Sequence, residues 1–119
     1  MDVRKANVTV MVSDFDRAVR FYTGTLGFAL AKRYGDEWAE VEAHGFTIGL
    51  HPAGPHGPRP GEGGALSIGL DVAAIESAKA ELESRGVGFD GPIKDDGAVR
   101  LAFFADPDGN PLYLCEQKH

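Results

Sequence analysis

Hydrophobic and polar residues alternate at the start of the chain and then change their period. Val8, Val10 and Val12 share one side of a strand expected over residues 7–12, because successive side chains of a strand point to opposite faces. Apolar residues then recur at helical spacing, which predicts an amphipathic helix packed on the valine face. This helical stripe consists of Phe15, Ala18, Val19, Tyr22 and Leu26.

The ends of this helix and the strands after it are marked by turn-forming residues. Ser13 or Asp14 is expected to cap the helix, and Gly27 to end it. Short apolar and polar runs then predict three antiparallel strands. These strands are expected over 28–34, 38–43 and 46–51, with turns at Gly35-Asp36 and His44-Gly45.

The second half of the chain repeats this construction. Leu66, Ile68 and Leu70 predict a strand face, and Ile75, Ala78 and Leu82 a helix stripe that ends at Gly86. Further strands are expected over 87–89, 99–105 and 111–116, with a turn at 106–109. A repeat of about 60 residues indicates two copies of one βαβββ unit.

A stretch with four prolines and five glycines, residues 52–65, separates the two copies. This density excludes regular structure, so we expect a connector between module one (1–51) and module two (66–119) of a single domain, 1–119. The predicted fold class is α+β. Its tandem modules form a curved, eight-stranded mixed sheet around a cleft, with the helices on the convex side.

Composition narrows the functional classes. The chain has 119 residues, a net charge of −6 and one cysteine. An acidic protein lacks the basic surface that nucleic-acid binding requires, and one cysteine excludes an intramolecular disulfide. Neither an apolar run of membrane-spanning length nor a signal-peptide pattern is found, so a soluble cytoplasmic protein is expected.

Three motifs resemble one known protein family. They are Val12–Tyr22 (VSDFDRAVRFY), Leu26-Gly27-Phe28, and Phe104–Pro111 (FADPDGNP). In this order the motifs are similar to those of the vicinal oxygen chelate superfamily, which includes glyoxalase I, extradiol dioxygenases and bleomycin-resistance proteins. The resemblance spans the whole chain and implies the fold and a homodimer. It does not choose among the many chemistries of the superfamily.

The resemblance also identifies the positions that bind metal in the metalloenzymes of the superfamily. In this sequence those four positions hold Asn7, Gly49, Ser67 and Tyr113. A divalent ion needs several imidazole or carboxylate ligands, which these residues do not supply. We therefore predict no metal and no cofactor.

Strand parity selects the side chains that face the expected cleft. Trp38 and Glu40 should face it, and Trp38 could stack on a planar ligand or only fill the cleft or a dimer contact. His51 shares the face of Gly49 and is either a base or hydrogen-bonding group in the pocket or a solvated histidine at a strand end. Tyr113 could hydrogen-bond a ligand or fill the core.

Parity leaves the direction of Arg100 open, and it places Cys115 on the side of Tyr113 without indicating a reactive thiol. The predicted ligand-binding residues come from both copies. They are Asn7, Thr9, Met11, Trp38, Glu40, His51, Ser67 and Tyr113. No catalytic residue is predicted.

Three functions are compatible with this sequence. The favoured one is a metal-independent protein that binds a small, planar aromatic or cationic molecule, similar to the bleomycin-resistance branch and so a candidate for antibiotic resistance. The alternative is a lyase, isomerase or dioxygenase with an unorthodox metal site or none, in which His51 would act with Glu42 or Asp71. The third is a degenerate subunit that only pairs with another protein.

Overall fold

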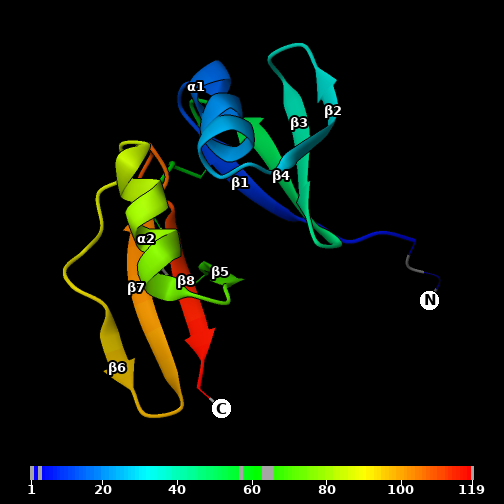
Figure 1. Cartoon of the computed structure of the whole chain (residues 1–119). Coiled ribbons are helices and arrows are strands. Elements are labelled where there is room, and N and C mark those ends of the chain that lie inside the picture. The colour runs from blue at the N-terminus through cyan, green and yellow to red at the C-terminus, as the bar shows by residue number, and fades with distance from the viewer. Residues whose placement is uncertain (1, 3, 57, 63–65, 119) are drawn as a thin grey trace. The chain divides into compact units, whose positions relative to one another are not determined.

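The structure, a computed structural model, describes residue 2 and residues 4–56, 58–62 and 66–118. Its chain divides into two compact units, Met1–Glu62 and Gly63–His119, which we call module 1 and module 2 and describe separately (Figure 1). Residues 57 and 63–65 of the predicted connector lie outside the described residues. None of the helices in the described ranges is long and apolar enough to cross a membrane.

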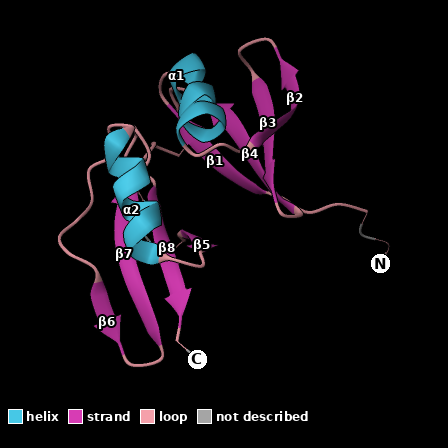
Figure 2. Ribbon diagram, viewed as in Figure 1, coloured by secondary structure: helices cyan, strands magenta, loops and turns pink. Residues whose placement is uncertain are grey.

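Module 1 has a four-stranded mixed sheet with strand order β1-β4-β3-β2, in which β1 and β4 are parallel. The helix α1 covers one face of this sheet (Figure 2). The elements are β1 (Val8–Val12), α1 (Phe15–Arg20), a π-helical turn η1 (Phe21–Thr25), β2 (Ala29–Tyr34), β3 (Trp38–Ala43) and β4 (Phe46–Pro52).

The buried core of module 1 follows the predicted stripe, but the last turn of the helix is not the regular α-helix that was expected. Val12 and Tyr22 are fully buried, as expected. The last turn widens to a π-helix, with the amide of Leu26 donating to the carbonyl of Phe21 at 2.9 Å. The Thr23 hydroxyl donates to the carbonyl of Val19, and a hydroxyl bonded four residues back bends a helix.

Module 2 repeats the topology, with strand order β5-β8-β7-β6 and α2 over one face (Figure 2). The elements are β5 (Ile68–Asp71), α2 (Ile75–Ser84), β6 (Lys94–Asp96), β7 (Val99–Ala105) and β8 (Pro111–Gln117). The predicted α+β class and its two βαβββ copies are therefore confirmed, with the eight strands divided into two four-stranded mixed sheets.

The strand predicted over 87–89 is wrong. Val87 completes the C-terminal cap of α2, because its amide donates to the carbonyl of Leu82 and the amide of Gly86 donates to that of Glu83. This is the Schellman motif, and the φ of +93° at Gly86 suits it. Val87 and Leu82 are both buried, so the apolar residue that suggested a strand packs against the helix end instead. The edge strand β6 forms later, at Lys94–Asp96.

The first strand of module 2 also begins later than predicted. Leu66 was expected on a buried strand face, yet it precedes β5 and is 77% exposed. Ile68 is buried, as expected. The turn predicted at 106–109 is confirmed: the carboxylate of Asp106 is buried and accepts hydrogen bonds from the amides of Asp108 and Asn110.

A carboxylate from the sheet caps the N-terminus of α2. The capping position holds Ala74, which has no side-chain acceptor, and Oε1 of Glu116 accepts the hydrogen bond of the Ile75 amide at 2.9 Å. Arg100 forms ion pairs with Glu76 and Glu116. These contacts place Arg100 on the α2 side of the sheet and answer the question that its strand parity left open.

Candidate ligand-binding faces

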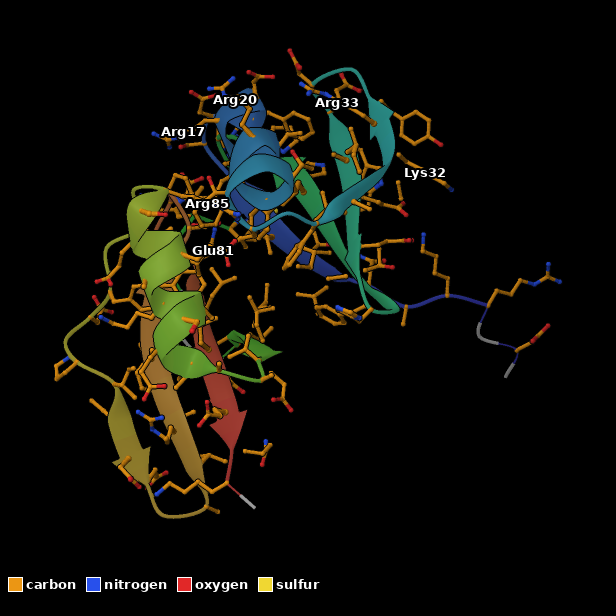
Figure 3. The ribbon with its side chains drawn as sticks, in the orientation of Figure 1. Arg17, Arg20, Lys32, Arg33, Glu81 and Arg85 are labelled. Carbon is orange, nitrogen blue, oxygen red and sulfur yellow. The ribbon has the colours of Figure 1, made fainter. Side chains whose placement is uncertain are left out.

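Each sheet has one face packed against the helix of its own module and one turned away from it, which we call the far face. In module 1, Ala39 and Val41 of β3 are fully buried under α1, which leaves Trp38 and Glu40 on the far face. Neighbouring β2 residues alternate in the same way, and Figure 3 shows Lys32 and Arg33 leaving the strand in different directions. Arg33 lies over the ring of Phe15 in α1.

The indole of Trp38 lies across Gly49 on the neighbouring strand. A Cβ atom built on Gly49 would lie 2.7 Å from Cζ2 of Trp38 and nearer still to Cη2. Any side chain at position 49 would need the space that the indole occupies. Trp38 is half-buried, and its ring contacts that of His51 edge-on, with centroids 6.3 Å apart. Because it has no side chain, Gly49 leaves room for an aromatic ring to lie against the strand on this face.

The carboxylate of Glu40 is held by two donors. Its Oε2 accepts the indole N–H of Trp38 at 2.9 Å, and its Oε1 accepts a hydrogen bond from the ammonium group of Lys5. The hydrogen bond from Lys5, and then that from Trp38, hold the pKa of Glu40 below its ordinary value. The same contact with Glu40 raises the pKa of Lys5. Glu40 is thus an ionised group that orients the indole.

The other predicted residues of module 1 lie around this cluster. Thr9 and Met11 on β1 are in register with Gly49 and His51 on β4, so all four belong to the far face. Nδ1 of His51 lies 2.7 Å from the carbonyl of Pro52. Asn7 precedes β1, is exposed, and donates its amide to the Thr9 hydroxyl at 3.0 Å.

Module 2 carries a similar ring over a glycine. Tyr113 on β8 is in register with Gly69 on β5, and a Cβ atom built on Gly69 would lie 2.8 Å from Cε2 of Tyr113 and nearer still to the hydroxyl. The ring of Phe103 on β7 lies beside it, at a centroid distance of 6.0 Å. The ammonium group of Lys94 stands over Phe103, 5.5 Å from the ring centroid. Two aromatic rings and one cation thus share this far face.

A cavity of about 390 Å³ opens beside these residues, a volume within the range of small-molecule sites. Its wall is mostly apolar, with a few polar groups from the strands and from the loop before β6. The lining residues are Ser67, Asp90, Lys94, Phe103, Phe104, Pro111 and Leu112. Of the two residues predicted in this module, Ser67 lines the cavity, whereas Tyr113 does not line it but lies beside Phe103, which does.

Sequence reasoning missed Lys5, Lys94 and Phe103. Register now places Leu101 opposite Cys115 and Phe103 opposite Tyr113 on the far face. Both faces of β7 are apolar in sequence, so the sequence does not show which face packs against α2. The burial of alternate residues in the structure shows it. No sequence signal locates the two lysines, because Lys5 contacts a residue 35 positions away and Lys94 lies in a strand that was not predicted.

The residues at the metal-binding positions of the superfamily do not fit a metal ion. Gly49 offers no side-chain donor atom and lies under the indole of Trp38, while the amide of Asn7 is bound to Thr9. Within the ranges that the structure describes, no three His, Cys, Asp or Glu side chains lie close enough together to hold a metal. The aromatic rings over Gly49 and Gly69 are thus the distinctive features of the two faces.

Known proteins resemble this chain over nearly its full length. A relative in Escherichia coli, the uncharacterized protein YaeR, is 33% identical over 93% of this chain and 94% of its own length. An uncharacterized protein of Mycolicibacterium smegmatis is 30% identical, with 88% and 86% covered.

A solved structure of TnmS3, described as an antibiotic binding protein from Streptomyces sp. CB03234, is 32% identical and has a TM-score of 0.77. The match covers 98% of this chain and all of TnmS3. A glyoxalase/bleomycin resistance protein from the same organism is 35% identical, with a TM-score of 0.70 over 92% of this chain and 98% of its own. The sequence profile of the Glyoxalase/Bleomycin resistance protein/Dioxygenase superfamily matches residues 5–114, and the chain belongs to that superfamily.

Proposed function

We propose that this protein binds and sequesters a small planar molecule, such as an antibiotic or an aromatic metabolite, without a metal ion. The observation that carries the proposal is the position of the Trp38 indole. Gly49 stands where the metalloenzymes of the superfamily have a metal ligand, and the indole fills the space that a side chain at Gly49 would need. A flat ring supported by the sheet offers a stacking surface, whereas a metalloenzyme would need a donor atom there.

Two further observations support binding. The His51 ring stands edge-on beside the indole, and Glu40 fixes the indole N–H, so the ring is held in place before any ligand arrives. Preorganised groups bind with a smaller entropy loss than mobile ones. The likeness to TnmS3, which is described as an antibiotic binding protein, favours the same class of ligand.

Fluorescence titration tests this function directly, because Trp38 is the single tryptophan of the chain. A panel of planar antibiotics and planar aromatic cations should include at least one compound that changes Trp38 emission saturably. Calorimetry should then show binding weakened about tenfold in Trp38→Ala, from the loss of stacking and buried area. Phe46→Ala is the matched control, since Phe46 is an exposed aromatic residue on β4 with the parity opposite to Gly49.

The metal content of the same purified protein distinguishes the enzyme alternative from the binding function. Protein purified without chelators should contain no stoichiometric divalent metal, and treatment with a chelator should leave the titration unchanged. A stoichiometric metal whose removal abolishes binding would favour the lyase, isomerase or dioxygenase instead. Flat titrations across the whole panel would contradict the binding function.

We also propose that the protein is a cytoplasmic homodimer, on the basis of the family resemblance. Light scattering coupled to size exclusion should give twice the chain mass of 12.7 kDa. A monomer at micromolar concentration would contradict the dimer without affecting the binding proposal.

A further inference from the structure

The cavity of module 2 differs from the Trp38 face in its charge. At the Trp38 face the carboxylate of Glu40 is already engaged by Lys5 and by the indole. At the cavity, no ion pair of Lys94 is found within the described part of the chain, and its ammonium group stands over the face of Phe103. An ammonium group on an apolar wall retains most of its capacity to bind an anion.

We propose that this cavity binds a planar aromatic acid, with its ring against Phe103 and Pro111 and its acidic group on Lys94. This inference rests on the proposed binding function and specifies the ligand class for one module. The apolar surface of the cavity comes from Phe103, Phe104, Pro111 and Leu112. The ring of Tyr113 lies beside that of Phe103, at a centroid distance of 6.0 Å. The hydroxyl of Ser67, also on the wall, adds one hydrogen-bonding group.

Asp90 limits the class of ligand further. It lines the same cavity and, like Lys94, forms no ion pair among the residues that the structure describes. This carboxylate would repel a second acidic group on the ligand, whereas it would accept a hydrogen bond from a hydroxyl or an amine. The cavity thus suits a ring with a single acidic group, and a hydrogen-bond donor placed away from that group strengthens the fit.

The test compares two probes with the same ring, 2-naphthoate and 2-naphthamide, by calorimetry on the full chain. The wild-type protein should bind the acid about tenfold more tightly than the amide, because a charge-assisted hydrogen bond replaces a neutral one. Lys94→Gln should remove this preference, and Lys94→Arg should keep it. Asp90→Asn should tighten binding of the acid by about threefold by removing a repulsion.

Lys79→Gln is the matched control. Lys79 belongs to the same module and also stands over a phenylalanine ring, 5.2 Å from the centroid of Phe89, yet it does not line the cavity. Its removal changes the net charge by the same amount, so the preference for the acid should survive. Amide shifts in NMR spectra should locate bound 2-naphthoate at residues 67, 90, 94 and 103.

Each outcome decides the inference separately from the proposed function. Equal affinity for acid and amide, or a preference that survives Lys94→Gln, overturns the inference. Loss of the preference in Lys79→Gln as well would show a general charge effect and overturn it too. If neither naphthalene probe binds but a planar cation changes Trp38 emission, the inference fails while the binding function stands. If nothing in either panel binds, both fail.

Discussion

The two modules share one topology and differ in the chemistry of their far faces. Gly49 is in register with the second residue of β1 and Tyr113 with the second residue of β5, so these two residues are counterparts. Glu40, the neighbour of Gly49, therefore corresponds to Phe103, the neighbour of Tyr113. Module 1 thus has a carboxylate where module 2 has a phenyl ring. The comparison shows how a duplicated sheet can keep its core while its two far faces carry different side-chain chemistry.

The largest expected effect is a loss of stability, and it distinguishes the two faces of β7. The face toward α2 belongs to the core of module 2, whereas the far face is turned away from the helix. Phe104 is 2% exposed on the α2 side, so Phe104→Ala should lower the free energy of unfolding by about 3–5 kcal/mol. Phe103→Ala, on the far face of the same strand, should cost less stability and should weaken binding of 2-naphthoate. Urea denaturation followed by circular dichroism measures both variants. Equal losses of stability would contradict the assignment of the two faces.

Both modules have an aromatic ring that lies over a glycine. Replacing the glycine by alanine adds one methyl group beneath the ring and so tests each contact. Gly49→Ala and Gly69→Ala should each cost about 1–3 kcal/mol, because the Cβ atom must displace the ring above it. Near-ultraviolet circular dichroism should report the reoriented indole in Gly49→Ala. Gly54→Ala and Gly88→Ala are the controls, since a Cβ atom there meets nothing within 4 Å. Unchanged spectra in Gly49→Ala would mean that the indole does not rest on this glycine.

The helices are capped in different ways. Asp14 caps α1 locally by accepting from the Arg17 amide, whereas Glu116 reaches α2 from β8. Asp14→Ala should cost about 1 kcal/mol in thermal or urea unfolding, and Glu116→Ala about as much or slightly more, since it also loses a contact with Arg100.

A local cap should rescue the loss of the distant one. The backbone at Ala74 is extended, with φ −136° and ψ 100°, which suits a capping residue. Ala74→Asp should therefore restore most of the stability lost in Glu116→Ala. Absence of rescue would show that Glu116 acts through Arg100 and not through the helix end.

The smallest effect concerns pH and belongs to module 1. Because the pKa of Glu40 is lowered in the folded protein, its contribution to stability should be complete above the ordinary value of 4.5. It should be lost as pH falls through the lower folded value. The stability difference between the wild-type protein and Glu40→Gln should therefore shrink below pH 4.5. Lys5→Gln should give the same profile, and the double variant no additional change, if Lys5 is the cause.

Much of this architecture could be predicted from sequence because local signals agree with the fold. The valines of β1, the stripe of α2 and the turn at His44-Gly45 each follow from local periodicity or backbone preference, and both turn residues have positive φ, as in a tight hairpin turn. The edge strand β6 could not be predicted, because Lys94, Asp95 and Asp96 have low strand propensity and pair only through β7.

The site was predictable only in part, for a related reason. Parity on β3 identified Trp38 and Glu40 because the other face of that strand is clearly apolar. Contacts between distant residues have no local signal, which is why Lys5 at Glu40 and Glu116 at the end of α2 emerge only from the folded chain. The ligand-binding roles of the predicted residues stay predictions for the titrations to test.

The two rings over glycine have a consequence for engineering the chain. Gly49 supports a ring from β3, while its counterpart Tyr113 is itself the ring, resting on Gly69 of β5. The two contacts therefore occupy non-equivalent positions of the two modules. A substitution transferred from one module to the equivalent position of the other would therefore meet a different environment, because the glycine that supports a ring in module 1 corresponds to the ring itself in module 2.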